Sequence, residues 1–366
     1  MMTKQNNGLY VHIPFCTTIC HYCDFPKLIY HEKYILPFLA QLERDLLIYE
    51  VPESLTTIYV GGGTPTSLSY GELEKLLMLL APYTKDVTEF TFEANVESLT
   101  KEKVLLLQKY GVNRLSIGVQ TTCNKKLAEL NRKHRYEDVV EVINFLHEID
   151  FTNFSVDLIF GLPGQTLSEL EKDVTAILKL NAPHLSLYNL TVEENTVAYL
   201  NEWPEASEET SRAMYLYIYE TLKAHGYERY EISNFAQSGY RSKHNELYWQ
   251  NLNYYAIGYG ASGYINRERY TIGGSFTKYI QGKLKVTREN ITEEMFIEEY
   301  IMLNLRREDG FLLHDFKART GYEFKELFGE KSKNLITSGL LEVTKERVLL
   351  TDEGKLLLNF VLFKLL

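Results

Sequence analysis

Three of the four cysteines lie at the spacing C-x3-C-x2-C, as Cys16, Cys20 and Cys23, directly after a short apolar run. A loop with this spacing can wrap three thiolates around one face of a cubane iron–sulfur cluster. Such a cluster keeps one iron open to an exogenous ligand, which favours chemistry over simple electron storage. The alternative is a zinc knuckle with His12 or His21 as the fourth ligand, because structural zinc needs a closed shell of ligands.

Strand-like apolar runs alternate with amphipathic helical stretches from Gly8 to about Thr191. The predicted strands are Leu9–Ile13, Thr57–Val60, Thr88–Phe92, Arg114–Gly118, Asn153–Ile159 and His184–Tyr188. The predicted helices are Lys33–Tyr49, Tyr70–Leu80, Lys101–Tyr110, Tyr136–Ile149 and Leu167–Leu180, the last beginning with a capping box. This alternation predicts an α/β fold, a partial (β/α)6 barrel whose parallel sheet carries outer helices. In such barrels the loops after the strands build the active site.

Polar residues follow several of these strands. The glycines of Gly61–Gly63 let backbone approach a small polar ligand, or form a plain tight turn. Glu93 is an acceptor placed for a ribose hydroxyl, and Gln120 ends the next strand at the same mouth. Arg132 is either a partner for a carboxylate or part of a solvated basic turn. Asp157 is an isolated carboxylate in an apolar strand, and a buried charge needs a partner or a ligand.

Length and composition narrow the class of protein. The 366 residues predict two to three domains, and the net charge of −10 disfavours nucleic acid or an anionic membrane surface as the main partner. The start MMTKQNNGLY has no apolar core of a signal peptide, and no apolar run is long enough to span a membrane. The few, clustered cysteines indicate a reducing cytoplasm. Cys123 is either a free thiol near the site or a small buried hydrophobe.

Six motifs together resemble the radical S-adenosylmethionine (SAM) superfamily over nearly the whole chain. They are YVHIPFC, C-x3-C-x2-C, GGGTPT, FEAN, RLSIGVQ and DLIFGLPGQT. They are similar to the branch that contains oxygen-independent coproporphyrinogen III dehydrogenase and the haem chaperones of the HemW type. The resemblance implies a [4Fe-4S] cluster on Cys16, Cys20 and Cys23, and it makes zinc the weaker alternative. It also implies contacts to SAM from Tyr10, Gly62, Gly63, Thr64, Glu93, Gln120, Arg132, Asp157 and Thr191.

Beyond Thr191 a helix is predicted over Ser207–His225 and a strand over Tyr227–Asn234. The string His-Asn-x-x-Tyr-Trp then begins at His244, a neutral-imidazole candidate for an axial haem ligand, with Tyr248 and Trp249 available to pack against a porphyrin. The alternative is a packed aromatic turn with a hydrogen-bonded histidine. The string matches the motif of the HemW branch, which implies a role in handling haem without fixing direct ligation.

The last region, from about Ile291, is predicted to be a winged-helix-like domain that ends in a hairpin. Helices are expected over Met295–Asn304, Leu312–Thr320 and Phe324–Leu335, and a two-stranded wing over Leu340–Leu350. Residues 288–366 carry a net charge of −3, whereas a DNA-binding face should be basic. We therefore expect a lid or a partner-docking domain. The expected domains are 1–195 (barrel core), 196–290 (α+β extension) and 291–366.

Two functions follow from the resemblance. The first is a haem chaperone that carries a [4Fe-4S] cluster and SAM and passes haem to an acceptor haemoprotein, without spanning a membrane itself; a membrane-associated acceptor stays open. The second is the radical decarboxylation of coproporphyrinogen III. The dehydrogenase has a further cysteine two residues after the last ligand, where this chain has Phe25, which favours the chaperone. A radical SAM enzyme with an unrelated substrate is a third alternative.

Overall fold

A twelve-stranded sheet forms the centre of the computed structural model, which describes residues 7–366. The prediction of no signal peptide falls partly on residues 1–6, outside the described residues. The middle of the sheet is parallel, in the order β11 (Tyr254–Ile257), β1 (Gly8–Ile13), β4 (Thr57–Gly62), β5 (Glu89–Asn95), β6 (Arg114–Gln120), β7 (Phe154–Phe160) and β8 (His184–Asn189). The six strands predicted for the barrel are confirmed.

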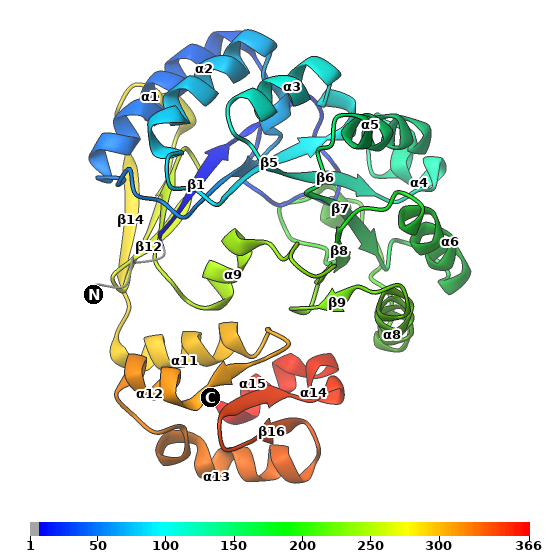
Figure 1. Cartoon of the computed structure of the whole chain (residues 1–366), viewed down its shortest axis with the longest axis vertical. Coiled ribbons are helices and arrows are strands. Elements are labelled where there is room, and N and C mark those ends of the chain that lie inside the picture. The colour runs from blue at the N-terminus through cyan, green and yellow to red at the C-terminus, as the bar shows by residue number, and fades with distance from the viewer. Residues whose placement is uncertain (1–6) are drawn as a thin grey trace.

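Helices cover the outer face of this sheet as an arc (Figure 1). They are α1 (Ile35–Ile48), α2 (Tyr70–Leu80), α3 (Lys101–Lys109), α4 (Asn124–Glu129), α5 (Tyr136–Glu148), α6 (Leu167–Leu178) and α8 (Glu208–Ala224). In α6 the buried residues Leu170, Val174 and Ile177 recur at helical spacing and face the sheet. The predicted capping box is confirmed, because the Glu169 N–H donates to Thr166 Oγ1 at 3.2 Å.

The single strand predicted over Tyr227–Asn234 is wrong. The segment forms two short antiparallel strands, β9 (Glu228–Arg229) and β10 (Asn234–Ala236), at one edge of the sheet. The Glu231 carboxylate accepts a hydrogen bond from the Ser233 N–H at 2.9 Å and so stabilises a turn between them. Strand-like alternation of residue types could not reveal this local contact.

Residues 243–290 extend the opposite side of the sheet. After α9 (Lys243–Trp249), β11 joins β1 in parallel, and an antiparallel meander of β12 (Ser262–Ile265), β13 (Glu268–Gly273) and β14 (Lys285–Asn290) completes that edge. The short helices α7 (Val197–Leu200) and α10 (Phe276–Tyr279) connect elements. Strands from residues 196–290 thus share one sheet with the barrel strands, and the expected domain boundaries at 195 and 290 stay predictions.

The C-terminal region has an apolar core of its own, which includes Phe316, Val348 and Val361. Its elements are α11 (Glu293–Asn304), β15 (Phe311–Leu312), α12 (Leu313–Thr320), α13 (Phe324–Thr337), β16 (Leu341–Val343), β17 (Arg347–Leu350), α14 (Asp352–Leu356) and α15 (Leu358–Leu365). The winged-helix-like arrangement is confirmed, with β15, β17 and β16 as its sheet. The hairpin is not its end, because α15 packs its buried face into the core.

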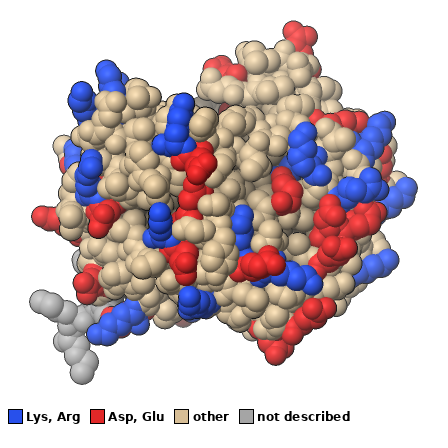
Figure 2. All heavy atoms as spheres, turned by 90° about the horizontal axis from the view of Figure 1, so that it is seen from above, with Lys and Arg blue, Asp and Glu red and all other residues tan. Residues whose placement is uncertain are grey.

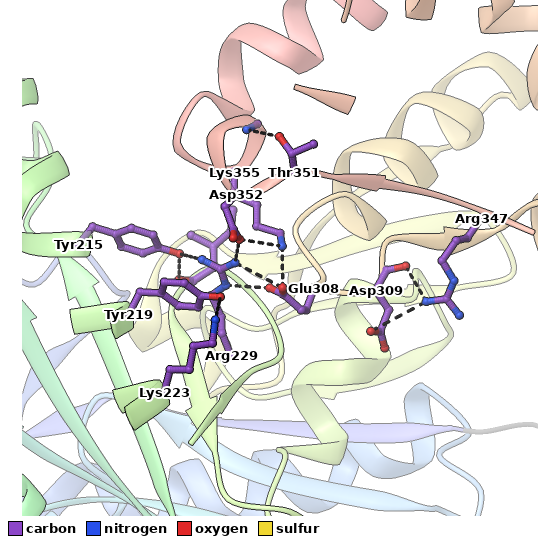
Figure 3. A network of polar contacts seen from close by, with 12 residues as sticks. Tyr215, Tyr219, Lys223, Arg229, Glu308, Asp309, Arg347, Thr351, Asp352 and Lys355 are labelled. Atoms are coloured by element: carbon purple, nitrogen blue, oxygen red, sulfur yellow. Dashed lines mark hydrogen bonds and ion pairs between the residues drawn. The ribbon is translucent and has the colours of Figure 1, made fainter. Parts of the chain in front are cut away.

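A network of ion pairs joins this region to the barrel (Figure 3). The Arg229 side chain on β9 is almost fully buried and pairs with Glu308 at 2.7 Å and with Asp352 at 2.6 Å. Lys355 also pairs with Glu308, at 2.7 Å. The guanidinium carbon of Arg229 also lies 4.1 Å from the centre of the Tyr219 ring. Moving the C-terminal region away from β9 would leave the buried Arg229 charge uncompensated. The ion pairs therefore favour the observed orientation of this region on the barrel.

The face formed by the outer helices carries Lys and Arg side chains interspersed with Asp and Glu (Figure 2). No broad basic area of the kind that follows a nucleic-acid backbone is seen on this face. In the part of the chain that the structure describes, every helix is too short or too polar to cross a bilayer.

Candidate iron–sulfur and cofactor site

The cysteine loop leaves the C-terminal end of β1 and is braced from two sides. Its start, β2 (Phe15–Cys16), pairs in parallel with β3 (Leu28–Ile29). On one side the Asn131 side-chain amide donates to the Ile19 carbonyl at 2.9 Å. On the other side the Thr64 N–H donates to the Phe15 carbonyl at 2.8 Å. The loop is therefore held as a fixed part of the barrel rim.

The glycine tract at the end of β4 lies against this loop. A Cβ on Gly63 would lie 2.8 Å from the Pro14 carbonyl carbon, and a Cβ on Gly62 would meet the His12 ring at 2.5 Å. Gly62 also has a φ of +111°, which disfavours other residues. The glycines thus allow close packing of two backbone segments. This geometry is compatible with both alternatives for the glycine tract, a tight turn and a loop that approaches a ligand.

All three cysteines are free thiols that line one cavity. Burial raises the pKa of Cys16 to about 11, and the hydroxyl of Thr64, 3.6 Å from its sulfur, opposes this shift. Burial also raises the pKa of Cys23, against the charge of Lys27. A metal must displace these protons, since the thiolate is the ligand form.

The two histidines of the zinc alternative have other partners. His12 Nε2 bonds the Pro26 carbonyl at 2.8 Å, and its Nδ1 bonds the Tyr10 hydroxyl at 2.8 Å. Burial lowers the pKa of His12 to about 4. His21 Nδ1 bonds the Glu129 carbonyl at 2.8 Å. Within residues 7–366, no group of three or more His, Cys, Asp or Glu side chains is arranged around a single metal ion in this conformation.

The cavity has a volume of about 320 Å³ and opens between the cysteine loop and the C-terminal ends of the strands. Most of the predicted site residues line it, namely Cys16, Cys20, Cys23, Gly62, Gly63, Thr64, Glu93, Gln120, Arg132, Asp157 and Thr191. Its size lies at the lower end of the range for small-molecule sites. The fold therefore gathers eleven predicted residues from seven separate segments of the chain into one chamber.

Glu93 is fixed on the wall of the cavity by two donors. Its Oε1 accepts a hydrogen bond from the Tyr59 hydroxyl at 2.7 Å, and its Oε2 accepts one from the Gly62 N–H at 2.9 Å. Burial raises the pKa of Glu93, while these two donors counteract the shift. The carboxylate is held with remaining lone pairs free to accept from a ligand hydroxyl.

Arg132 is buried, so it is not part of a solvated turn. Its guanidinium donates to the Asn95 side-chain oxygen at 2.8 Å and to the Gly118 carbonyl at 2.7 Å. It also lies 3.7 Å from the Cys20 sulfur and 3.5 Å from Glu97. Burial alone would lower the pKa of Arg132, but its anionic and thiol neighbours raise it. A permanent positive charge therefore lies beside the thiols.

Gln120 reaches the cavity through an unusual backbone. Its φ is +69°, in the left-handed region, and the pairing of β6 with β7 shifts register between Gly118 and Gln120. Such a bulge turns a side chain at a strand end and is common next to functional sites. Gly118 leaves room for this side chain, because a Cβ there would lie 2.7 Å from the Gln120 amide nitrogen and displace it.

Asp157 has two neutral partners. Its Oδ2 accepts from the Ser116 hydroxyl and its Oδ1 from the Ser155 hydroxyl, each at 2.7 Å. These bonds meet the need for a partner that the sequence indicated, and they hold the carboxylate at the cavity wall. Cys123 does not line the cavity; it is half-buried at the start of α4.

Tyr10 and His244 lie outside this cavity. Tyr10 lines a smaller pocket of about 250 Å³ with Phe25, Tyr248 and Tyr254. His244 is fully buried in α9, where Nδ1 bonds the Thr57 hydroxyl at 2.7 Å and Nε2 bonds the Tyr248 hydroxyl at 2.8 Å. Both ring nitrogens are thus occupied, and burial lowers the pKa of His244 to about 3.

Several residues of the site were missed from the sequence. Asn95 bonds both Arg132 and the Thr64 hydroxyl, the latter at 3.0 Å. It lies two residues after Glu93 on β5, so the alternation of side chains along a strand could have revealed it. Arg114 and Ser116 precede Gly118 on the same face of β6 and line the same cavity. Reading only the ends of the strands left these deeper positions out.

Comparison with known proteins agrees with this geometry. Residues 10–177 match the model of the radical SAM superfamily, and residues 291–357 match that of the HemN C-terminal domain. Two relatives named heme chaperone HemW are 38% identical (Lactococcus lactis) and 41% identical (Bacillus subtilis). The alignments cover 100% and 96% of this chain, and 98% and 97% of those proteins.

The chain belongs to the HemW family. Its fold also matches the solved structure of coproporphyrinogen III oxidase (HemN) from Escherichia coli, described there as a radical SAM enzyme. The TM-score is 0.84 over 99% of this chain and 91% of the other, at 21% sequence identity. This similarity confirms the predicted fold. Membership of the radical SAM superfamily implies a [4Fe-4S] cluster and SAM.

Proposed function

We propose that this protein is a haem chaperone, which binds haem and transfers it to an acceptor haemoprotein while carrying a [4Fe-4S] cluster and SAM. The observation that carries the proposal is the full-length match to proteins named heme chaperone HemW. The chemistry of the cavity supports the two resident cofactors. Three thiols, two fixed carboxylates, the Gln120 side-chain amide and the buried guanidinium groups of Arg114 and Arg132 face one chamber.

In this proposal Cys16, Cys20 and Cys23 would hold the cluster. The Arg132 guanidinium lies 3.7 Å from the Cys20 sulfur, so its positive charge would offset the negative charge of the ligand thiolates. A bound cluster would supply one-electron chemistry to SAM. Glu93 and Asp157 are acceptors for ligand hydroxyl or ammonium groups, because their carboxylate oxygens keep free lone pairs. Donors from the protein already hold both carboxylates in place. Such prior fixation lowers the cost of ordering the site on binding.

Phe25 separates this proposal from the dehydrogenase alternative. The resemblance places a further cysteine of that enzyme at this position, and this chain has an aromatic ring there that is 61% exposed. Phe25 lines both the main cavity and the smaller aromatic pocket of Tyr10, Tyr248 and Tyr254. An exposed ring at this junction suits packing against a flat macrocycle. We therefore propose that the chain lacks dehydrogenase activity.

We propose that the His-Asn-x-x-Tyr-Trp string contacts haem through Tyr248, with His244 buried behind it. Haem ligation by His244 requires the bonds to Thr57 and Tyr248 to break, since both ring nitrogens are occupied. A spectrum of haem bound to His244→Gln that matches the wild-type spectrum would reject ligation by His244. Tyr248 lines the aromatic pocket in the present arrangement and is available for packing against haem.

The acceptor is proposed to dock on the C-terminal region. Two phenylalanines of α15, Phe360 and Phe363, are 48% and 79% exposed while the opposite face of the helix is buried. The membrane-associated acceptor also stays a proposal. The protein is expected to work in the cytoplasm, because the cluster cysteines must stay reduced.

The test is a titration of haem into reconstituted protein, paired with an assay of coproporphyrinogen III decarboxylation. The proposal predicts a saturable Soret band and no carbon dioxide above a Cys20→Ala control. Formation of carbon dioxide and protoporphyrinogen IX would favour the dehydrogenase. Haem binding no tighter than to a non-specific carrier protein would contradict the chaperone.

A further inference from the structure

Arg114 is a buried cation without an anionic partner. It is the first residue of β6, it lines the main cavity, and the residue is 2% exposed. Among residues 7–366 its guanidinium makes no hydrogen bond or ion pair to protein, and its buried Nε has no acceptor. A guanidinium stays charged at every pH that the protein meets. A buried charge is costly unless a partner or a ligand compensates it.

The polar groups next to Arg114 carry no negative charge at neutral pH. Burial, together with the charge of Arg114, holds the pKa of His184 well below its usual range and that of His244 at about 3. Burial raises the pKa of Tyr59 and of Tyr230, so both hydroxyls stay protonated. None of these four neighbours can compensate the guanidinium.

The two carboxylates of the cavity are engaged elsewhere. Asp157 accepts from Ser116 and Ser155 at 2.7 Å each. Glu93 accepts from Tyr59 and from the Gly62 N–H. Neither carboxylate forms an ion pair with Arg114 within the described part of the chain, although both belong to the same chamber. The donors of Arg114 therefore remain available to a ligand.

The position of Arg114 defines a floor that is distinct from the cysteine end. Arg114 precedes Gly118 by four residues on β6, which corresponds to roughly 13 Å along a strand. Its register partner on β5 is Thr91, whose buried hydroxyl also lacks a hydrogen-bond partner. Asn245 of α9 lines the cavity as well. The Arg114 guanidinium and the Asn245 side-chain amide thus offer polar contacts in one chamber, whereas Thr91 does not line it.

We propose that Arg114 binds a carboxylate group of a ligand that reaches the floor of the main cavity. The planar fork of a guanidinium matches a carboxylate through two parallel hydrogen bonds. Two ligands of this protein would bring carboxylates, haem through its propionates and SAM through its methionine part. Arg132 already supplies a guanidinium at the cysteine end, so we expect the propionate to be the group at Arg114. The choice of haem as the ligand that brings this carboxylate rests on the proposed function.

The experiment compares each ligand with a counterpart that lacks the carboxylate. Haem and haem dimethyl ester, and SAM and decarboxylated SAM, are titrated into reconstituted wild-type protein and into Arg114→Gln and Arg114→Lys. We expect the wild type to bind haem at least about tenfold more tightly than the ester. Arg114→Gln should bind haem and ester equally, and Arg114→Lys should recover part of the preference. Thr91→Val, at the same level of the barrel, should retain it.

Every outcome decides the proposal. If Arg114→Gln removes the carboxylate preference for SAM and not for haem, Arg114 binds a carboxylate as proposed. The carboxylate is then that of SAM and not a haem propionate. No carboxylate preference for either ligand in the wild type overturns the proposal, even if the variants fail to fold. An equal loss for ligand and counterpart in a folded Arg114→Gln overturns it too, because the role would then be structural. A wild type that binds no haem contradicts the proposed function, while the SAM titrations still decide Arg114.

Discussion

The two ends of the parallel strands carry opposite kinds of polar site. At the C-terminal ends, Glu93, Asp157 and the three cysteines turn their functional atoms toward an open cavity. At the N-terminal ends, α9 closes the barrel, and both ring nitrogens of His244 are hydrogen-bonded, to Thr57 and to Tyr248. The side chains at the C-terminal ends face an open cavity, whereas internal hydrogen bonds hold α9 at the N-terminal ends and contribute stability. The His-Asn-x-x-Tyr-Trp string, which resembles the motif of the HemW branch, therefore has a structural task in this conformation.

Glu89 shows how firmly α9 is tied down. This first residue of β5 accepts hydrogen bonds from the N–H groups of Lys243 and His244 at 2.8 and 2.9 Å. A carboxylate at a helix start satisfies unpaired donors and meets the positive end of the helix dipole. Gly8 permits the close approach, because a Cβ there would meet the Leu247 side chain at 2.7 Å.

The largest effect is expected at the open end. Replacing Cys16, Cys20 or Cys23 by serine should abolish the cluster, since each thiolate is one of only three protein ligands. Iron and sulfide analysis after reconstitution, together with the visible absorption of the cluster, measures the loss. Cys123→Ser is the matched control and should keep full loading, because Cys123 does not line the cavity. A fully loaded Cys20→Ser protein would break the assignment.

At the closed end, Glu89→Ala should lower the free energy of unfolding by about 3 kcal/mol, because buried donors at the start of α9 lose a charged acceptor. Chemical denaturation measures this change. Glu89→Gln keeps an acceptor oxygen and should lose less. Equal stability of Glu89→Ala and wild type would show that α9 is not anchored as described.

Asn95→Ala tests the fixed geometry of the open end. The change removes the 2.8 Å contact that orients Arg132 beside Cys20, so we expect SAM to bind about tenfold more weakly with a stability loss of only about 1 kcal/mol. Asn95→Asp keeps the acceptor for Arg132 and serves as the control. Calorimetric titration of SAM into cluster-loaded protein gives the affinities. A large stability loss with unchanged SAM affinity would contradict a positioning role.

The last prediction concerns the pH dependence of the closed end. The pKa of His244 is about 3 in the folded protein and about 6.5 when unfolded, so the unfolded chain binds the extra proton between these values. Stability must then fall as pH falls. Between pH 7.5 and 5.5 the free energy of unfolding of the wild type should fall by about 1.4 kcal/mol because of this histidine. His244→Gln should not show this part of the decrease. Identical pH profiles of the two proteins would place His244 in a solvated environment.

Sequence patterns predicted the open end better than the closed end. Each barrel strand carries its own apolar run, and Glu93 and Asp157 interrupt such runs visibly. The register of β11 beside β1 and the anchoring of α9 by Glu89 depend on contacts between residues far apart in the chain. The turn at Glu231 and the unpaired state of Arg114 also arise only in three dimensions. Local periodicity contains none of this information.

The central claim, that this protein delivers haem, is tested most directly by transfer. Haem-loaded wild-type protein is mixed with an apo-haemoprotein whose holo form has a distinct absorption spectrum, and the rate of its formation is measured. We predict transfer that saturates with acceptor concentration and exceeds the rate of passive haem release into an excess of apomyoglobin. A rate that is independent of the acceptor and equal to passive release would contradict the account.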